Sequence, residues 1–187
     1  LHAGHLALVK RASDENDSVV VSIFVNPTQF NNQEDLKKYP RTLQRDMEQL
    51  KPYSKVVVFN PSVGEMYGDH VQTEEYHFGM LETVMEGEHR PGHFKGVATI
   101  VRRLFEIVSP DRAYFGEKDY QQLAIIRSLV KQMKIPVEIV GHPIERANNG
   151  LALSSRNELL SDTGREKAGI IFETMLYVQN RMRQFGI

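Results

Sequence analysis

The feature that most constrains the fold is the run Ser-Val-Val-Val-Ser-Ile-Phe-Val at residues 18–25. Its β-branched side chains do not alternate with polar ones. A continuous run of this kind is typical of a strand that is buried on both faces of a parallel sheet. Shorter apolar runs predict three more strands, at 55–59, 112–115 and 137–141.

Amphipathic stretches between these runs predict helices. The clearest spans 95–108, where apolar side chains recur at helical spacing: Val97, Ile100, Val101, Leu104, Phe105 and Val108. We predict further helices at 4–16, from Pro40 to residue 50, at 77–86, at 119–133 and at 163–184, with polar loops up to residue 39, at 60–72 and at 87–93. Strands that alternate with helices predict the α/β class, here a Rossmann-like, doubly wound parallel sheet. Ligands of such sheets bind beyond the carboxyl ends of the strands, so we expect the chemistry in loops that follow strands.

Composition limits the classes of function. Of 187 residues, 41% are hydrophobic and 25% are charged, which is enough apolar material for a folded core. The 23 Lys and Arg residues against 24 Asp and Glu residues give a net charge of −1, so bulk charge suggests no nucleic-acid partner. Cysteine is absent, which excludes disulfides and a thiol nucleophile. Because the sequence shows no membrane-span-length apolar run and no signal-peptide pattern, we expect a cytoplasmic location and no membrane partner.

The domain organisation follows from the same pattern. Residues 1–150 predict one α/β domain, and residues 151–187 lead toward a second domain. The chain starts at Leu1 on a motif rather than before it, and it stops within the last predicted helix. We therefore expect a piece of a longer protein.

The first candidate for chemistry is His2-Ala3-Gly4-His5, at the opening of a predicted helix. Glycine lets a phosphate approach the backbone closely, and the free N–H groups of a helix N-terminus bind anions. Imidazoles can add hydrogen bonds to the phosphate oxygens. Chance would give this pattern in about one chain in fifty of this length and composition. The alternative is a pair of surface histidines at a frayed helix end.

Three other stretches follow strands or probable strands, and two of them carry groups that could bind phosphate. Gly116-Glu117-Lys118-Asp119 opens a predicted helix, where Lys118 could neutralise phosphate charge and Asp119 could cap the helix or hold a ribose hydroxyl. Ser154-Ser155-Arg156 offers two hydroxyls and a guanidinium for phosphate oxygens, although a plain helix cap is the alternative.

Side-chain amides supply two more candidates. Gln29 lies in the Asn26–Phe30 stretch after the first strand, where an amide can both donate and accept hydrogen bonds. Gln122 follows Lys118 by four residues, so both share one helix face. The alternative for both glutamines is ordinary surface polarity.

Six stretches together resemble one family. They are LHAGH (1–5), SIFVNPTQF (22–30), YPRTLQRD (39–46), GEHRPGHFKGVATIV (87–101), PDRAYFGEKDYQQL (110–123) and GLALSSRN (150–157). In this order and spacing they resemble the pantothenate synthetase (pantoate–β-alanine ligase) family of the H-x-G-H nucleotidyltransferase superfamily. The resemblance covers nearly the whole chain, and RPGHF-x-GV and FGEKD-x-QQL are far more specific than H-x-G-H alone.

The resemblance implies an ATP-dependent ligase that forms a C–N bond in two steps. Pantoate attacks the α-phosphate of ATP to give pantoyl adenylate and pyrophosphate, and β-alanine then displaces AMP to give pantothenate. Carried over position by position, His2, His5, Lys118 and Arg156 would be catalytic, with His5 as the proton donor to pyrophosphate. Gln29 and Gln122 would bind pantoate, and Gln29 also β-alanine. The ATP-binding residues would be Leu1, His2, Ala3, Gly4, His5, Gly116, Glu117, Lys118, Asp119, Glu145, Leu153, Ser154, Ser155 and Arg156.

The resemblance also implies Mg²⁺ carried on the ATP phosphates without protein ligands of its own, and a homodimer. Three departures from the family pattern stand out. The family has a strand and a Pro-x-Met-Gly turn before H-x-G-H, it has a smaller C-terminal domain, and it more often has an apolar residue at the position of Glu145. Another adenylyltransferase of the same superfamily and an inactive nucleotide-binding fragment are therefore the alternatives. Gln29 and Gln122 argue against the first of these.

Overall fold

The computed structural model describes residues 1–39 and 41–186. Its strands are β1 (Val19–Ser22), β2 (Val56–Phe59), β3 (Arg112–Gly116) and β4 (Glu138–His142). Its α-helices are α1 (Ala3–Glu15), α2 (Gln33–Lys38), α3 (Leu43–Leu50), α4 (Val63–Tyr67), α5 (Glu86–His89), α6 (His93–Val108), α7 (Tyr120–Met133), α8 (Asp162–Lys167) and α9 (Ile170–Phe185). Short 3₁₀ turns are η1 (Pro27–Gln29), η2 (Gly79–Glu82), η3 (Glu117–Asp119) and η4 (Ser155–Leu159).

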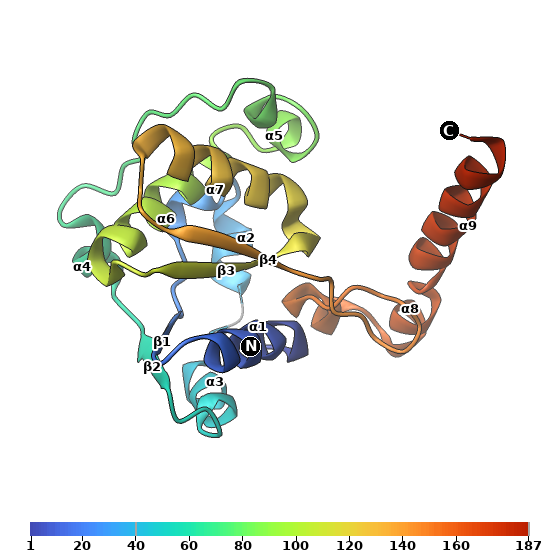
Figure 1. Ribbon diagram of the computed structural model, residues 1–187, viewed down its shortest axis with the longest axis horizontal. Helices are drawn as coiled ribbons and strands as arrows, with labels where there is room; N and C mark the ends of the chain where they lie inside the picture. Colours follow the sequence, from blue (N-terminus) through green and yellow to red (C-terminus); the bar gives the residue numbers. More distant parts are fainter. Residues whose placement is uncertain (40, 187) are drawn as a thin grey trace.

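The strands pair in parallel, and helices lie on both sides of them (Figure 1). β1 pairs with β2 in the register Val19 to Val56, and β3 pairs with β4 in the register Arg112 to Glu138. Helix α1 contacts both β1 and β3, whereas α6 and α7 pack together and α7 contacts β3 and β4. The predicted α/β class with parallel strands is confirmed.

Within the described residues the four strands form two pairs rather than one continuous sheet. A cavity of about 1480 Å³ is lined by β1 and β3 but by neither β2 nor β4, so it lies along the two unpaired edges. Helix α1 contributes Val9 and Ala12 to its wall, and α6 contributes Leu104 and Phe105. An extended segment would be needed to join the two pairs. The resemblance places a family strand just before the H-x-G-H motif.

The hydrophobic core lies where α6 and α7 pack. The predicted apolar face of α6 is largely confirmed, with Val97 2% and Phe105 7% exposed. From α7, Ile125, Ile126 and Leu129 are fully buried in the same core. The core fixes α6 rigidly, and α6 in turn supports the loop that follows β1, since α6 and η1 are in contact.

Two predictions about the first strand are wrong in part. The strand covers Val19–Ser22 and not all of 18–25, and Val20 remains 41% exposed, so it is not buried on both faces. The physical reason is the environment of β1. The strand borders β2 on one edge and the cavity on the other, so its inner edge is not covered by protein.

Several helix predictions need correction. The predicted helix 77–86 is instead η2 and α5, because the backbone turns left-handed at Gly79 (φ 59°) and Met85 (φ 52°). Helices α2, α4 and α5 lie in stretches that the sequence predicts as loops, and α6 starts earlier than residue 95. Pro40, predicted to open a helix, lies outside the described residues, and α3 begins at Leu43.

The predicted helix 163–184 is divided into α8 and α9. At the division a side chain on Gly169 would collide with the backbone oxygen of Asn149. Helix α9 projects away from the body of the molecule (Figure 1). No helix among the described residues is long and apolar enough to cross a membrane.

Candidate active site

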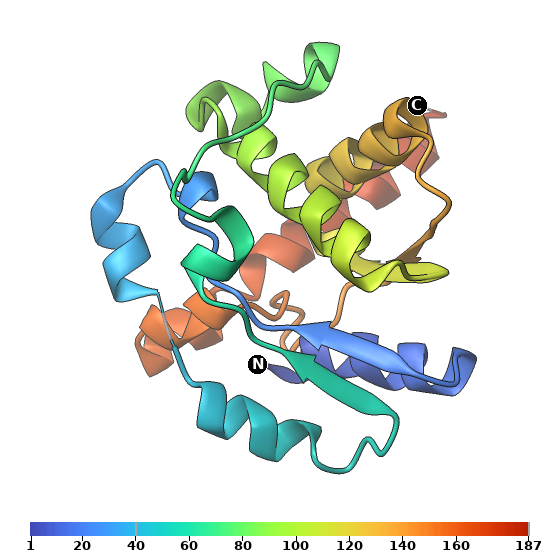
Figure 2. The ribbon, with the colours of Figure 1, turned by 90° about the vertical axis from the view of Figure 1, so that its left-hand side faces the viewer.

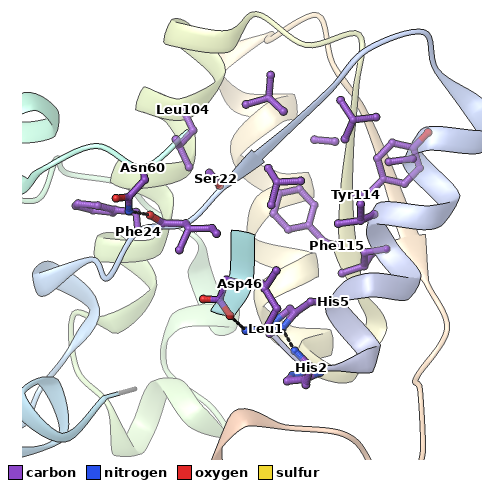
Figure 3. Close-up of a pocket in the computed structure, with 18 of the residues that line it drawn as sticks. Leu1, His2, His5, Ser22, Phe24, Asp46, Asn60, Leu104, Tyr114 and Phe115 are labelled. Atoms are coloured by element: carbon purple, nitrogen blue, oxygen red, sulfur yellow. Dashed lines mark hydrogen bonds and ion pairs between the residues drawn. The ribbon is translucent and has the colours of Figure 1, made fainter. Parts of the chain in front are cut away.

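The site is built around the first turn of α1. His2 has extended backbone geometry and caps the helix, and its carbonyl oxygen accepts a hydrogen bond from the His5 backbone N–H at 2.8 Å. The two imidazole rings stack with centroids 3.8 Å apart and planes 30° apart (Figure 3). The predicted helix opening at this motif is confirmed, and the histidines are half-buried rather than frayed.

The hydrogen bonds assign the tautomer of His5. Its Nδ1 accepts from the His2 backbone N–H at 3.3 Å, so in the neutral ring the proton sits on Nε2. Burial, and then the neighbouring His2, lower the pKa of His5 to about 4. Burial also lowers the pKa of His2. At neutral pH both rings are therefore uncharged hydrogen-bond donors.

The cavity brings distant segments to this histidine pair. Leu1, His2 and His5 line it together with Leu153, Ser154 and Ser155, from the other end of the chain. Six of the predicted ATP-binding residues thus line one cavity. Figure 2 shows the segment after β4 returning to the start of α1.

Glu145 lies beside the same turn. A side-chain carbon placed on Gly4 would lie 3.6 Å from Cβ of Glu145, so the two residues are neighbours. The Glu145 carboxylate faces His142, whose Nε2 is 3.4 Å away. The Glu145 backbone oxygen accepts from the Leu153 backbone N–H at 2.9 Å. This hydrogen bond joins the two ends of the segment 145–153 next to α1.

The predicted Gly116–Asp119 stretch lies at the carboxyl end of β3. Glu117, Lys118 and Asp119 form the exposed turn η3, and Lys118 Nζ lies 3.2 Å from Asp119 Oδ1. The positive charge of Lys118 contributes to lowering the pKa of both His2 and His5. None of these three residues lines the cavity, so η3 lies near the histidine pair but outside the cavity lining.

Arg156 is exposed and lies outside the cavity lining, unlike the two serines before it. Ser154 Oγ accepts a hydrogen bond from the Arg156 backbone N–H at 3.2 Å and so caps η4. This is the role expected of a plain helix cap. The Arg156 guanidinium lies 5.9 Å from the centre of the Tyr39 ring. The structure therefore places the hydroxyls, but not the guanidinium, on the cavity wall.

Gln29 occupies a separate position, in the turn η1 that packs against α6. Its backbone oxygen lies 2.9 Å from His93 Nδ1 and accepts from Arg90 at 3.2 Å. Gln122 is half-buried on α7. No hydrogen bond joins the two predicted pantoate residues in the described part of the chain, and neither lines the cavity.

Sequence reasoning missed several residues of this region. Asp46 is 5% exposed, lines the cavity, and accepts a hydrogen bond from Thr42 Oγ1 at 3.2 Å. Gln121, not Gln122, is buried and bonds to the backbone of residues 81–86. Both lie in quoted family stretches, but nothing in the local pattern marks them as buried.

No group of three or more His, Cys, Asp or Glu side chains within the described ranges is arranged to hold a metal ion. The polar residues that line the cavity include the imidazoles and hydroxyls of His2, His5, Ser154 and Ser155. They also include four arginines and five acidic residues: Arg41, Arg45, Arg112 and Arg165, and Glu15, Asp17, Asp46, Asp111 and Glu158. The imidazole and hydroxyl donors among them suit an anion at the N-terminus of α1.

Comparison with known sequences gives a consistent result. A family model described as pantoate-beta-alanine ligase matches residues 1–186. The pantothenate synthetase of Christiangramia forsetii is 55% identical over 187 residues, which is 100% of this chain and 65% of that protein. The pantothenate synthetase of Bacteroides thetaiotaomicron is 58% identical over 175 residues, which is 94% of this chain and 62% of that protein.

Solved structures agree with the sequences. The pantothenate synthetase of Thermus thermophilus superposes with a TM-score of 0.94 at 50% identity, covering 98% of this chain and 67% of that chain. The pantoate-beta-alanine ligase of Francisella tularensis, complexed with beta-gamma ATP and beta-alanine, gives a TM-score of 0.87 at 45% identity, covering 92% of this chain and 66% of that one. The chain thus spans about two thirds of the length of these relatives.

Proposed function

This chain belongs to the pantoate-beta-alanine ligase family, and from that premise we propose that the protein joins pantoate to β-alanine with cleavage of ATP to AMP and pyrophosphate. In the first step a pantoate carboxylate oxygen attacks the α-phosphate, and the bond to pyrophosphate breaks. In the second step the β-alanine amine attacks the acyl carbon of pantoyl adenylate. AMP leaves, and the amide of pantothenate remains.

The observation that carries this proposal is that the stacked His2 and His5, at the α1 N-terminus, line the same cavity as Ser154 and Ser155. Helix N-terminal N–H groups, imidazole N–H groups and hydroxyls all donate to phosphate oxygens. The part of the cavity next to these residues therefore fits the triphosphate of ATP, whereas the part between β1 and β3 is the space that an extended segment would fill.

The chemistry of the first step suits these residues. A carboxylate is already ionised at neutral pH, so the attack needs no general base. It needs two anions held together and negative charge stabilised as pyrophosphate departs. His5 can donate from Nε2, and the phosphates would raise its lowered pKa. In this proposal Lys118 and Arg156 approach the phosphates from η3 and from the segment that begins at Leu153, comparable to the mobile KMSKS loop of class I aminoacyl-tRNA synthetases.

Pantoate and β-alanine would bind next to this ATP site. We assign pantoate to Gln29 and Gln122 and β-alanine to Gln29. Mg²⁺ would be held by ATP phosphates and water, in keeping with its preference for oxygen ligands. The Francisella tularensis relative solved with beta-gamma ATP and beta-alanine supports the choice of ATP and β-alanine as ligands.

The proposal extends to domains, assembly and location. Residues 1–150 would bind ATP and pantoate. Residues 151–187 would supply the phosphate loop and lead into a C-terminal domain. A homodimer in the cytoplasm is assigned by family resemblance, and sedimentation of the purified protein tests the dimer.

Pantoate-dependent exchange of labelled pyrophosphate into ATP tests the function. With Mg²⁺ and without β-alanine, exchange should require pantoate and should not occur with nicotinamide mononucleotide or phosphopantetheine. Exchange with one of those acceptors instead would assign the chain to another adenylyltransferase activity. ATP binding without any exchange, in a protein folded by circular dichroism, would favour the inactive nucleotide-binding alternative.

A further inference from the structure

The turn that carries Gln29 is fixed against α6. A side chain on Gly96 would overlap the backbone oxygen of Thr28, so the two backbones touch directly. His93 and Arg90 hold the backbone oxygen of Gln29 from the same side. The backbone of η1 therefore has little freedom, and the direction of the Gln29 side chain depends on its own hydrogen bonds.

Asn26, just before this turn, is 2% exposed and has a defined amide orientation. The backbone oxygen of Gly96 can only accept, and it lies 3.1 Å from Asn26 Nδ2. The Thr28 backbone N–H can only donate, and it lies 3.4 Å from Asn26 Oδ1. These two partners fix which end of the amide is the oxygen and which is the nitrogen.

Tyr67 completes the environment of Asn26. Its hydroxyl lies 2.6 Å from Asn26 Oδ1, an atom that carries no hydrogen, so the tyrosine must be the donor. Burial raises the pKa of Tyr67, which keeps that proton in place at neutral pH. The Arg103 guanidinium lies 4.7 Å from the centre of the Tyr67 ring and helps hold the ring.

The orientation of the Asn26 amide determines the orientation of the Gln29 amide. Asn26 Nδ2 donates to Gln29 Oε1 at 3.4 Å, which turns the Gln29 NH₂ group away from Asn26. Within residues 1–39 and 41–186 that NH₂ group has no hydrogen-bond partner. It can therefore donate to a ligand, whereas the oxygen of the same amide is already engaged.

From this chain of contacts we propose that Tyr67 is a positioning residue that acts through Asn26 to hold the Gln29 amide with its NH₂ group toward the substrate. An NH₂ group presented in this way favours a carboxylate and disfavours an ammonium group. The proposal rests on the assignment of Gln29 to pantoate and β-alanine. It adds that Gln29 recognises the acid end of these substrates and not the amine of β-alanine.

A matched pair of substitutions provides the kinetic test. Tyr67→Phe removes only the hydroxyl. Tyr76→Phe removes the hydroxyl of an equally buried tyrosine, which donates to Glu74 Oε2 at 2.9 Å rather than to Asn26. In pyrophosphate exchange Tyr67→Phe should raise the KM for pantoate about 5- to 15-fold and leave the KM for ATP unchanged. Tyr76→Phe should change neither. An unchanged pantoate KM in Tyr67→Phe, or an equal rise in both variants, would overturn the proposal.

Amide spectroscopy provides a test that needs no activity. In ¹⁵N-labelled protein, Tyr67→Phe should shift the side-chain NH₂ signals of Asn26 and Gln29 and speed their exchange with solvent, and Tyr76→Phe should not. Unmoved signals in Tyr67→Phe would contradict the positioning role even if the protein showed no exchange activity. If the wild-type protein showed no pyrophosphate exchange but the NH₂ signals shifted in Tyr67→Phe, the proposed function alone would be rejected.

A second variant covers the case in which Tyr67→Phe does not fold. Thr28 Oγ1 donates to Asn26 Oδ1 at 3.0 Å and lies 3.1 Å from the Tyr67 hydroxyl. Thr28→Val keeps the shape of the side chain and removes this donor, so it should move the same two NH₂ signals in the same direction. If those signals stay in place in a folded Thr28→Val protein, the network does not orient Gln29.

Discussion

The imidazole of His5 lies stacked on that of His2, with ring centroids 3.8 Å apart, at the first turn of α1. Burial disfavours a charge on both rings and lowers the pKa of each, and His2 further lowers the pKa of His5, so the pair stays neutral in the absence of ligand. At the histidine pair itself, an incoming triphosphate would meet uncharged hydrogen-bond donors. The pair is therefore suited to stabilise negative charge that develops during the reaction.

His5→Ala should lower the rate of pantoate-dependent pyrophosphate exchange about 100- to 1000-fold, because it removes a donor to the departing pyrophosphate. The exposed His70 provides a control, since His70→Ala removes a histidine without touching the cavity. Circular dichroism should show both variants folded. Exchange near the wild-type rate in His5→Ala would show that the histidine pair has no catalytic role.

Stability should fall as the pH is lowered from 6.5 toward 4. The unfolded chain binds a proton at His5 near pH 6.5, whereas the folded chain binds it only at about pH 4, so protons favour unfolding across this window. The full effect of His5 is on the order of 3 kcal/mol. The lowered pKa values of His2 and His93 add to it in the same direction.

Urea denaturation at several pH values measures this dependence. The free energy of unfolding of His5→Ala should change less between pH 6.5 and pH 4 than that of the wild type. If the two curves run parallel over this range, His5 does not titrate with a lowered pKa in the folded protein.

Gly96→Ala should displace the turn that carries Gln29, since the added methyl group would overlap the Thr28 backbone oxygen. We expect a loss of about 1–3 kcal/mol in the free energy of unfolding and a raised KM for pantoate. Gly64→Ala is the matched control, because its methyl group would meet nothing closer than Ser62 Oγ at 4.0 Å. Equal stability of the two variants would argue against the close contact between α6 and η1.

Glu145→Val should change the KM for ATP by no more than about twofold. The bond that ties this residue to Leu153 comes from the Glu145 backbone oxygen, which the substitution keeps. Loss of the 3.4 Å contact with His142 should be the main structural effect. A large rise in the KM for ATP would mean that the carboxylate itself contacts the nucleotide.

Periodicity predicted most of the secondary structure, because the residues that form each element are neighbours in sequence. The apolar spacing in 95–108 identified the face of α6 that packs in the core. The exposure of Val20 was not predictable from its run of β-branched neighbours, because it depends on whether another strand borders β1. The left-handed residues Gly79 and Met85 likewise interrupt a stretch whose spacing alone suggested a helix.

The sequence predicted some residues of the candidate site and missed others. The sequence identified His2, His5, Ser154 and Ser155, and the fold places them on one cavity. Tyr67 could not be found in this way, since it reaches Asn26 across 41 positions of the chain and looks like any apolar residue of a helix. A buried polar network is created by tertiary packing, so local patterns do not reveal it.

Oxygen transfer from labelled pantoate tests the central claim most directly. With pantoate labelled with ¹⁸O in its carboxylate, together with β-alanine, ATP and Mg²⁺, mass spectrometry of the products follows the oxygen. Attack of the carboxylate on the α-phosphate predicts one ¹⁸O atom in AMP and none in pyrophosphate. Labelled inorganic phosphate with ADP, or unlabelled AMP formed alongside pantothenate, would contradict the account.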